Sequence, residues 1–383
     1  MAYGEGLLVV LLCVLWGGYG YILWRWGFFS MGGFQEGDQA DFPRLKVSVL
    51  IPARNEARTL PRCLESLLSQ TYQPDEIWVI NDHSEDGTVE VAKAYAQQHP
   101  HIRVASLSPG ERGKKAALRL GIRCASGEII LTTDADTWHP PYTIEHMIRP
   151  FRRPEIQVVG GWIRLSQDGK WLTDFQRIEV AGLLTLTAGS WMRGEPITAN
   201  GALLAYRRQA FEAVGGWGDA EYHPSGDDDL LVQRISLYFG SQALAFSRAV
   251  VETAPVPTFH AFIQQRLRWL SKRHLYPVAR TRWGLMVVGL AHLSLILSVI
   301  WAPPSILLAW LIIWALQVGI AWRGFYYTQS SPPPWPRWLF ALVLYPIYQV
   351  YVGILALRRP PFQWKGRTYT ASGELIPNLE KPL

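Results

Sequence analysis

The sequence is poor in cysteine and lacks several motifs that would assign it to a common functional class. Cys13, Cys63 and Cys124 show neither metal-site nor disulfide spacing, and we interpret them as reduced thiols. A Walker P-loop and a Gly-x-Gly-x-x-Gly turn are absent, so ATPase and dinucleotide dehydrogenase functions have no support. Arginine-rich arms and zinc-finger spacing are absent as well. We therefore predict no nucleic-acid partner, despite the net charge of +6.

Hydrophobic residues make up 49% of the 383 residues and concentrate at the two ends of the chain. The stretch 6–29 is long enough to span a bilayer. It lacks a basic n-region and a small-residue cleavage site, so we interpret it as an anchor and not as a removed signal peptide. Three more apolar stretches lie at 284–301, 305–322 and 338–357, the last with Pro346 inside it. They predict a C-terminal membrane region with two or three spans.

The distribution of Lys and Arg predicts how the chain is oriented in the membrane. No Lys or Arg precedes the first span, whereas Arg25 and Lys46 follow it, which places the N-terminus outside and residues 30–283 in the cytosol. The last apolar stretch has Arg337 before it and more basic residues after it. It either crosses against the rule, re-enters the membrane or lies in its plane. We thus predict a multi-pass protein of the cell membrane with a cytosolic catalytic domain.

Apolar runs alternate with amphipathic helices in the middle of the chain. The predicted strands are 47–51, 76–80, 102–107 and 129–131. This alternation is typical of an α/β fold with a doubly wound parallel sheet. Right-handed crossovers bring the carboxyl ends of the strands to one edge, where such sheets bind ligands. We therefore expect Pro52, Asp82 and Asp134 to lie close together.

Asp134 and Asp136 follow the fourth strand. One interpretation is an ordinary acidic turn, and the other is a divalent cation site. Mg²⁺ and Mn²⁺ prefer oxygen ligands and are often held by one or two carboxylates together with substrate phosphates. Lys114 begins a helix and suits a phosphate, and Asp82 suits a base imide. Together these residues predict a site for a nucleotide diphosphate and a metal.

Seven segments, in this order, resemble the motifs of family 2 glycosyltransferases. They are 52–56, 81–88, 113–118, 133–136, 200–203 with 215–217, 226–231 and 265–269. The resemblance covers roughly residues 44–275 and implies a GT-A-type, Rossmann-like fold with a mostly parallel sheet. Two positions depart from the family pattern: Asn81 stands where the family often has Asp, and Arg119 where it often has Asn.

The resemblance also implies roles for individual residues. Contacts to the nucleotide-sugar donor are expected from Pro52, Ala53, Asn55, Glu56, Asp82, Lys114 and Asp134. Contacts to the acceptor and the diphosphate are expected from Asn200, Gly201, Ala202, Gln265, Arg268 and Trp269. The metal, Mg²⁺ or Mn²⁺, is expected on Asp134 and Asp136.

Three adjacent carboxylates, 227–229, precede an apolar helical pattern. One interpretation is N-terminal capping, since acids suit the first turn of a helix. The resemblance instead makes Asp228 the general base and Asp227 its supporting neighbour. The spacing to Arg234, six residues beyond Asp228, aligns Asp228 rather than Asp229 with the base.

The stretch 258–275 is amphipathic and rich in Arg, Trp and Phe. It predicts a helix on the bilayer surface, and the resemblance makes the same helix part of the acceptor site. Both interpretations hold at once if a surface helix presents its motif to the active site. We interpret His223 and His260 as surface or core histidines.

These features divide the chain into five segments. They are a transmembrane anchor at 1–29, a catalytic domain at 30–257, an interface helix at 258–283, a transmembrane region at 284–357 and a basic tail at 358–383. The layout resembles that of ceramide glucosyltransferase and similar enzymes. It implies inverting transfer of one sugar from a nucleotide donor, expected to be UDP-linked, to a lipid hydroxyl in the bilayer.

Two alternatives remain from the sequence. The chain is a polysaccharide synthase subunit that borrows spans from a partner, or it is an inactive nucleotide-sugar-binding module. A processive synthase needs a tunnel that is generally built from more spans than are present here. The intact acidic motifs argue against an inactive module. The sugar, the lipid and the oligomeric state are left open by the sequence.

Overall fold

The computed structural model describes residues 2–29, 44–301 and 304–376. The start of the predicted catalytic segment, 30–43, and the end of the predicted tail, 377–383, lie outside these residues.

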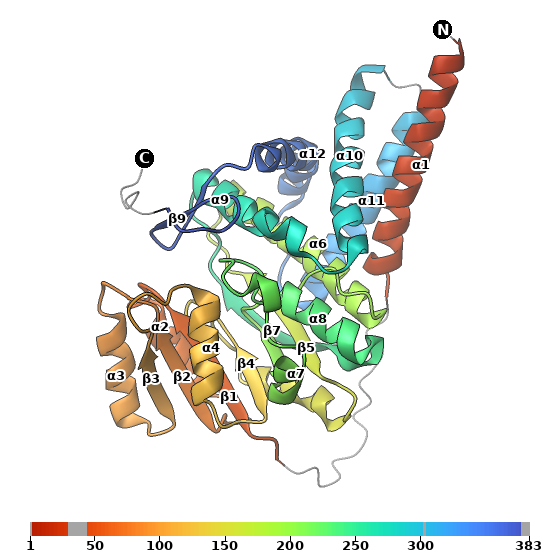
Figure 1. Cartoon of the computed structure of the whole chain (residues 1–383). Helices are drawn as coiled ribbons and strands as arrows, with labels where there is room; N and C mark the ends of the chain where they lie inside the picture. The colour runs from red at the N-terminus through yellow and green to blue at the C-terminus, as the bar shows by residue number, and fades with distance from the viewer. Residues whose placement is uncertain (1, 30–43, 302–303, 377–383) are drawn as a thin grey trace.

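A seven-stranded sheet with the order β3-β2-β1-β4-β6-β5-β7 forms the centre of the catalytic part (Figure 1). Its strands are β1 (Val47–Ala53), β2 (Glu76–Asn81), β3 (Ile102–Ser106), β4 (Ile129–Thr132), β5 (Val158–Leu165), β6 (Leu204–Arg207) and β7 (Leu244–Thr253). The first four strands are parallel to one another. β6 is antiparallel to both of its neighbours, and β5 and β7 are again parallel. The prediction of a mostly parallel sheet is confirmed.

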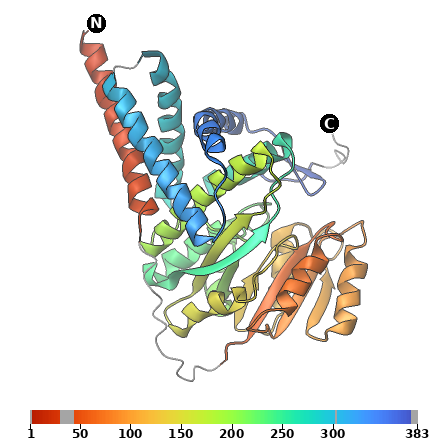
Figure 2. The same ribbon diagram turned by 180° about the vertical axis from the view of Figure 1, so that it is seen from behind.

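The four predicted strands coincide with β1 to β4 to within two residues at each end. All four residues of β4 are buried, as are Ile77, Val79 and Ile80 of β2. A strand covered on both faces buries both sets of alternating side chains, which explains the continuous apolar runs. α4 lies in front of these strands in Figure 1, and α2 lies in front of them in Figure 2. The sheet is therefore doubly wound.

Helices connect the strands and extend the domain towards the C-terminal half. They are α2 (Leu60–Leu68), α3 (Thr88–Gln98), α4 (Lys114–Cys124), α5 (Thr143–Ile148), α6 (Trp171–Met192), α7 (Arg208–Ala213), α8 (Asp229–Phe239) and α9 (Phe259–Ser271). Short 3₁₀ helices are η1 (Arg149–Arg152), η2 (Gly218–Ala220), η3 (Ser241–Ala243) and η4 (Lys272–Leu275). α6 and α9 pass over the sheet domain on the side where the apolar helices stand (Figure 1).

The four predicted apolar stretches form α1 (Ala2–Gly27), α10 (Ala279–Trp301), α11 (Pro304–Tyr327) and α12 (Trp335–Leu357). By length and composition, α10, α11 and α12 are each able to cross a membrane. α1, α10 and α11 stand side by side, and α12 is seen nearly along its axis (Figures 1 and 2). α12 therefore runs across the other three. If those three cross a membrane, α12 lies along its plane, which is one of the alternatives left open by the charges.

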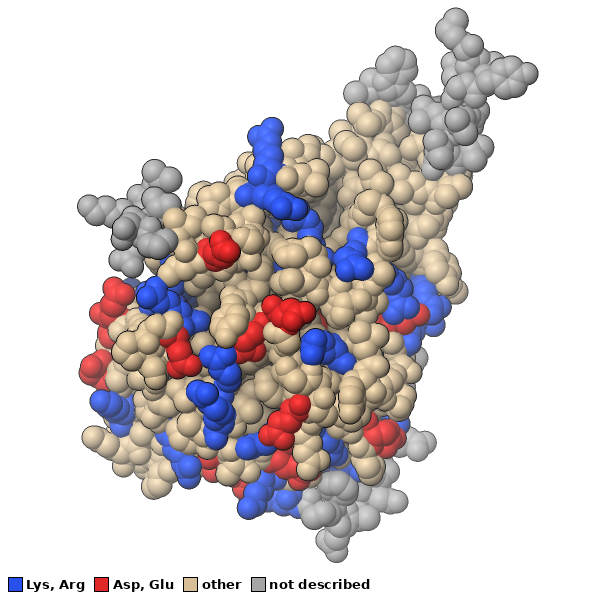
Figure 3. All heavy atoms as spheres, in the orientation of Figure 1, with Lys and Arg blue, Asp and Glu red and all other residues tan. Residues whose placement is uncertain are grey.

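Charged side chains gather at the base of the standing helices (Figure 3). Arg25 at the end of α1 and Arg280 at the start of α10 both form ion pairs with Glu195, at 2.9 and 3.2 Å. Above this level, the described surface of the helices carries few charges (Figure 3). This is the charge distribution expected at a boundary between water and lipid.

The basic segment that we treated as a tail is partly folded. β8 (Phe362–Trp364) and β9 (Arg367–Tyr369) form an antiparallel hairpin. Lys365 and Gly366 make its turn with φ angles of 49° and 74°, a left-handed conformation that favours glycine. The hairpin packs against α9, and its Arg367 bonds to Asp82, which directly follows β2.

Candidate active site

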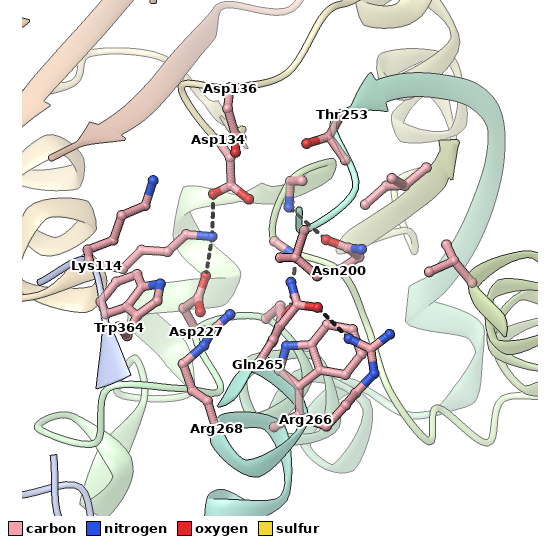
Figure 4. A pocket seen from close by; sticks show the side chains of 18 of the residues that line it. Lys114, Asp134, Asp136, Asn200, Asp227, Thr253, Gln265, Arg266, Arg268 and Trp364 are labelled. Carbon is pink, nitrogen blue, oxygen red and sulfur yellow. Dashed lines mark hydrogen bonds and ion pairs between the residues drawn. The ribbon is translucent and has the colours of Figure 1, made fainter. Parts of the chain in front are cut away.

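The carboxyl ends of the parallel strands open into a cavity of about 610 Å³. Its other walls come from α6, the start of α8, α9 and the C-terminal hairpin (Figure 4). With the exception of Asn55, every residue predicted for a donor, acceptor, metal or catalytic role lines this cavity. Segments far apart in the sequence thus meet here, as expected for the strand ends of a doubly wound sheet.

Asn55 has a different place. Its Oδ1 accepts a hydrogen bond from the Glu85 amide at 2.8 Å, and its own amide donates to Ser84 Oγ at 3.1 Å. Its φ of 55° is in the left-handed region, which Asn adopts more readily than most residues. Asn55 does not line the cavity, and its donor contact stays a prediction. Asn55 joins the loops that follow β1 and β2.

Lys114 lies between two carboxylates from different motifs (Figure 4). Its Nζ is 2.7 Å from Asp134 Oδ1 and 3.0 Å from Asp227 Oδ2. Burial alone would lower the pKa of Lys114, but the two carboxylates outweigh burial and raise that pKa above its usual value. Gly201 permits this approach, because a Cβ there would lie 2.6 Å from Asp227 Oδ2. The lysine therefore stays charged and ties the start of α8 to the end of β4.

Asp134 and Asp136 form an acidic corner with Glu56. Burial, together with the charges of Asp134 and Glu56, raises the pKa of Asp136 to about 6. A divalent cation would relieve this repulsion, so the donor set fits a hard metal. The described residues contain no group of three or more His, Cys, Asp or Glu that would hold a metal by themselves. A cation on these two carboxylates would thus need the donor phosphates to complete its ligands.

The three carboxylates at the start of α8 have three different environments. Asp227 pairs with Lys114, as described. Asp228 Oδ1 accepts a hydrogen bond from the Asp229 amide at 2.7 Å, and Oδ2 accepts one from the Gly201 amide at 2.9 Å. Asp228 is thus both the N-cap of α8 and a cavity residue. Oδ1 also lies 3.7 Å from Lys272 Nζ, whereas Oδ2 keeps a second lone pair, which suits a proton acceptor.

Asp229 also lines the cavity, but it is almost fully buried and its carboxylate is engaged by neighbours. Its Oδ2 lies 2.6 Å from Lys272 Nζ and accepts a hydrogen bond from the Tyr276 hydroxyl at 2.7 Å. Lys272 and Tyr276 belong to the segment that joins α9 to α10. Asp229 therefore anchors the base of the apolar helices to the acidic motif.

α9 presents Gln265, Arg268 and Trp269 to the cavity. Arg268 forms no ion pair within the part of the chain that the structure describes. Burial lowers its pKa, and the charge of Asp227 partly opposes this effect. Its charge is therefore available to an anionic ligand. The adjacent Arg266 also lines the cavity, where it donates a hydrogen bond to Gln265 (Figure 4), and it reaches the helices, where it pairs with Glu179. α9 thus has one face on the cavity and one on the apolar helices, so both interpretations of this stretch are compatible.

The hairpin supplies residues that the sequence analysis missed. Arg367 holds the Asp82 carboxylate with two hydrogen bonds, Lys365 pairs with Glu56, and Trp364 lies with its ring 5.2 Å from the Arg268 guanidinium carbon. The sequence signal that could have identified this hairpin is the run of Trp364, Lys365 and Arg367 around Gly366. From the sequence, the basic residues are interpreted only as flanks of the last apolar stretch.

Comparison with known proteins places the catalytic part in a defined class. Residues 48–215 match the family model described as Glycosyl transferase family 2. The chain therefore carries a family 2 glycosyltransferase domain, and the predicted family is confirmed.

Two curated relatives illustrate the range of this family. One is the poly-beta-1,6-N-acetyl-D-glucosamine synthase of Staphylococcus epidermidis, 28% identical over 235 residues that cover 60% of this chain and 54% of the relative. The other is the beta-monoglucosyldiacylglycerol synthase of Synechocystis sp., 27% identical over 265 residues that cover 64% and 52%. The chain thus spans about half the length of the curated relatives that it matches.

A solved structure matches nearly the whole chain. It is the mannosyltransferase PcManGT from Pyrobaculum calidifontis, in complex with GDP-Man and Mn²⁺. The match covers 93% of this chain and 98% of the other, with a TM-score of 0.53 and 20% identity. The likeness shows the fold, which is the GT-A-like α/β fold that the motifs implied.

Proposed function

We propose that this protein is a membrane-bound inverting glycosyltransferase. In this proposal it transfers one sugar from a nucleotide-sugar donor to the hydroxyl of a lipid, without repeating the step on the product. The observation that carries the proposal is the approach of four charged groups to one cavity: Asp134, Lys114, Asp228 and Arg268. Sugar transfer from a diphosphate requires a base for the acceptor hydroxyl, positively charged side chains for the phosphates and carboxylates that can hold a metal.

The reaction is a single displacement at the anomeric carbon. The acceptor oxygen attacks as Asp228 takes its proton, and the bond from the anomeric carbon to the diphosphate oxygen breaks on the opposite face. The configuration at that carbon is inverted. A positioned general base typically contributes about 10²–10⁴-fold to such a rate. Asp227 supports the site through Lys114, which it shares with Asp134.

The leaving diphosphate carries the charge that the site must stabilise. Arg268 suits this task because its planar fork pairs with phosphate oxygens, and Lys114 adds a second positive charge at the start of α4. A divalent cation held by Asp134 and Asp136 would supply further stabilisation of the diphosphate charge. The complex of the mannosyltransferase with Mn²⁺ is compatible with such a metal in this fold.

The donor site is assigned to the strand ends near Pro52, Ala53, Glu56 and Asp82, and we infer a UDP-linked sugar from the resemblance to ceramide glucosyltransferase. The acceptor side is assigned to Asn200, Gly201, Ala202, Gln265 and Trp269. The glycolipid synthase among the relatives supports a lipid acceptor. The standing apolar helices support a site close to the bilayer, at the cell membrane.

A processive polysaccharide synthase is the second candidate. It is favoured by the identity of 28% to the poly-beta-1,6-N-acetyl-D-glucosamine synthase. Among the described residues, α10, α11 and α12 are long and apolar enough to span a membrane, and α12 runs across the other two. Few crossing helices are then available for a polymer tunnel, which favours transfer to a lipid.

Mass spectrometry of lipids separates these candidates. Cells that express the protein are compared with cells that express Asp228→Asn and with cells that lack both. We expect one new glycolipid species that requires Asp228, and its mass gives the sugar and the lipid. A ladder of products that differ by one sugar, or a released polymer, would instead establish the synthase.

A further inference from the structure

A second cavity, of about 100 Å³, lies among the helices beside the reaction cavity. Its walls come from α1, α6, α11 and α12. They are mostly apolar and include Leu186, Ile320, Trp338 and Leu342. Two of the four helices, α11 and α12, are long and apolar enough to cross a membrane. The cavity therefore lies where the standing helices meet the catalytic domain.

The polar groups in its wall are engaged by neighbours. Glu179 pairs with Arg266 and accepts a hydrogen bond from the Tyr348 hydroxyl at 2.8 Å. Gln317 Nε2 donates to the Tyr19 hydroxyl at 2.9 Å. The surface that remains towards the cavity is mostly hydrocarbon, so water finds few partners there and an apolar ligand is favoured.

α6 separates this apolar cavity from the reaction cavity. Val180, Leu184 and Thr187 line the reaction cavity, and Gly182 lines the apolar one. Leu183 lines both cavities, and 37% of its surface remains exposed. The two spaces thus adjoin at one side chain of one helix.

We propose that the apolar cavity holds an acyl chain of the lipid acceptor, while the acceptor hydroxyl extends past Leu183 towards Asp228. This inference rests on the proposed function, since it takes the acceptor to be a lipid. The arrangement keeps hydrocarbon out of water while a polar head enters the polar cavity. Each methylene buried in this way is worth about fourfold in affinity, which corresponds to about 0.8 kcal/mol.

A leucine at Gly182 tests the proposal. A Cβ at this position meets only Ala321 Cβ, at 3.8 Å, so the backbone accepts a side chain whose further atoms fill the cavity. Leu also favours a helix more than Gly does, which protects folding. Gly353→Leu on α12 is the matched control, because a Cβ there meets nothing within 4 Å and Gly353 does not line the cavity.

The measurement is photo-crosslinking of the full chain in nanodiscs. The probe is dioleoylglycerol with a diazirine in one acyl chain, and the adducts are located by peptide mass spectrometry. We expect adducts on the peptides of the four wall helices, α1, α6, α11 and α12, in the unchanged protein and in Gly353→Leu, and at least a tenfold loss in Gly182→Leu. Adducts that are as frequent on α10, which does not line the cavity, with no effect of Gly182→Leu, would overturn the proposal.

A second probe tests whether the occupant is an acceptor. Phosphatidylcholine with the same diazirine chain has no free hydroxyl, and equal labelling of the cavity by both probes would overturn the acceptor assignment. The labelling requires no turnover, so its failure is distinct from failure of the proposed function. Specific labelling without any glycolipid product would support the acyl-chain cavity and contradict the proposed transferase function. A glycolipid product together with unspecific labelling would support the transferase function and contradict the acyl-chain cavity.

Discussion

Arg367 holds the carboxylate of Asp82 with both terminal nitrogens, at 2.7 and 2.9 Å, across 285 residues of sequence. Both side chains are almost completely buried, with 8% and 5% of their surface exposed. Asp82 Oδ2 also accepts a hydrogen bond from the Gly113 amide at 3.0 Å. The residue that we predicted to contact the nucleotide base is thus bound to the C-terminal hairpin. The hairpin forms a wall of the cavity at the ends of β1 and β2.

The first prediction concerns this pair. Arg367→Gln should weaken donor binding by at least tenfold, because the hairpin would then release Trp364 and Lys365 from the cavity wall. The measurement is calorimetric binding of UDP to the purified full chain. Arg358→Gln, a change of the same kind at an exposed position of the same segment, should bind normally. Tighter binding by Arg367→Gln would show that the hairpin competes with the donor and that this prediction is wrong.

β1, β2 and β4 could be predicted from sequence because each is a local apolar run covered on both faces. β3 is an edge strand in which only Ile102 is buried, and it could be predicted from the alternation of strands and helices. The last three could not. β5 contains Gly160 and Gly161, which weaken a strand pattern, and a Cβ at Gly161 would lie 2.3 Å from Leu203 Cδ2. β6 has only four residues and is antiparallel in a mostly parallel sheet. Long-range packing determines these strands.

The candidate site divides in the same way. Residues that follow strands, such as Asp82 and Asp134, could be placed at one edge by topology alone. The contacts of Lys365 and Arg367 could not be predicted, because the sequence contains no measure of which distant carboxylate a basic side chain meets. A positive charge beside an apolar stretch is also what a lipid surface requires. The basic residues after the last apolar stretch therefore have two possible explanations, a lipid surface or contacts with distant carboxylates, and the sequence alone does not distinguish them.

The second prediction separates two neighbouring carboxylates. Asp228→Asn keeps the size and the capping ability of the side chain but takes up no proton, so kcat should fall by about 10²–10⁴-fold. This fall corresponds to about 3–5 kcal/mol at the barrier. Asp229→Asn should retain turnover but unfold at lower temperature, because it removes the charge that Lys272 faces in a buried position. Sugar transfer and thermal unfolding are measured for both variants. If Asp229→Asn were inactive with a normal melting temperature, the general base would be Asp229 and not Asp228.

The third prediction concerns the metal. Asp136 lies in the acidic corner with Asp134 and Glu56, so Asp136→Ala should abolish turnover by removing a ligand. Chelation with EDTA should abolish turnover reversibly, and Mn²⁺ or Mg²⁺ should restore it. The circular dichroism of the variant serves as the control for folding. Full activity in excess EDTA would exclude the proposed metal role.

The last prediction is a dependence of stability on pH that arises at His139. This side chain is buried between Ser66 Oγ, 3.0 Å from Nδ1, and Thr133 Oγ1, 2.9 Å from Nε2. Burial lowers its pKa to about 3, against 6.5 for the free side chain. Between pH 6.5 and 3 the unfolded chain therefore binds a proton that the folded chain does not bind, so stability falls as the pH falls. At pH 5 the loss amounts to about 2 kcal/mol relative to pH 7.

His139→Gln removes the titrating group, so its stability should change less between pH 7 and pH 5 than that of the unchanged protein. Thermal unfolding followed by tryptophan fluorescence at both pH values provides the measurement. His274→Gln, at an exposed position, is the control and should behave as the unchanged protein does. The prediction compares differences between two pH values, so a lower stability of His139→Gln at pH 7 does not affect it. Equal losses on acidification in His139→Gln and in the unchanged protein would show that His139 is protonated in the folded state.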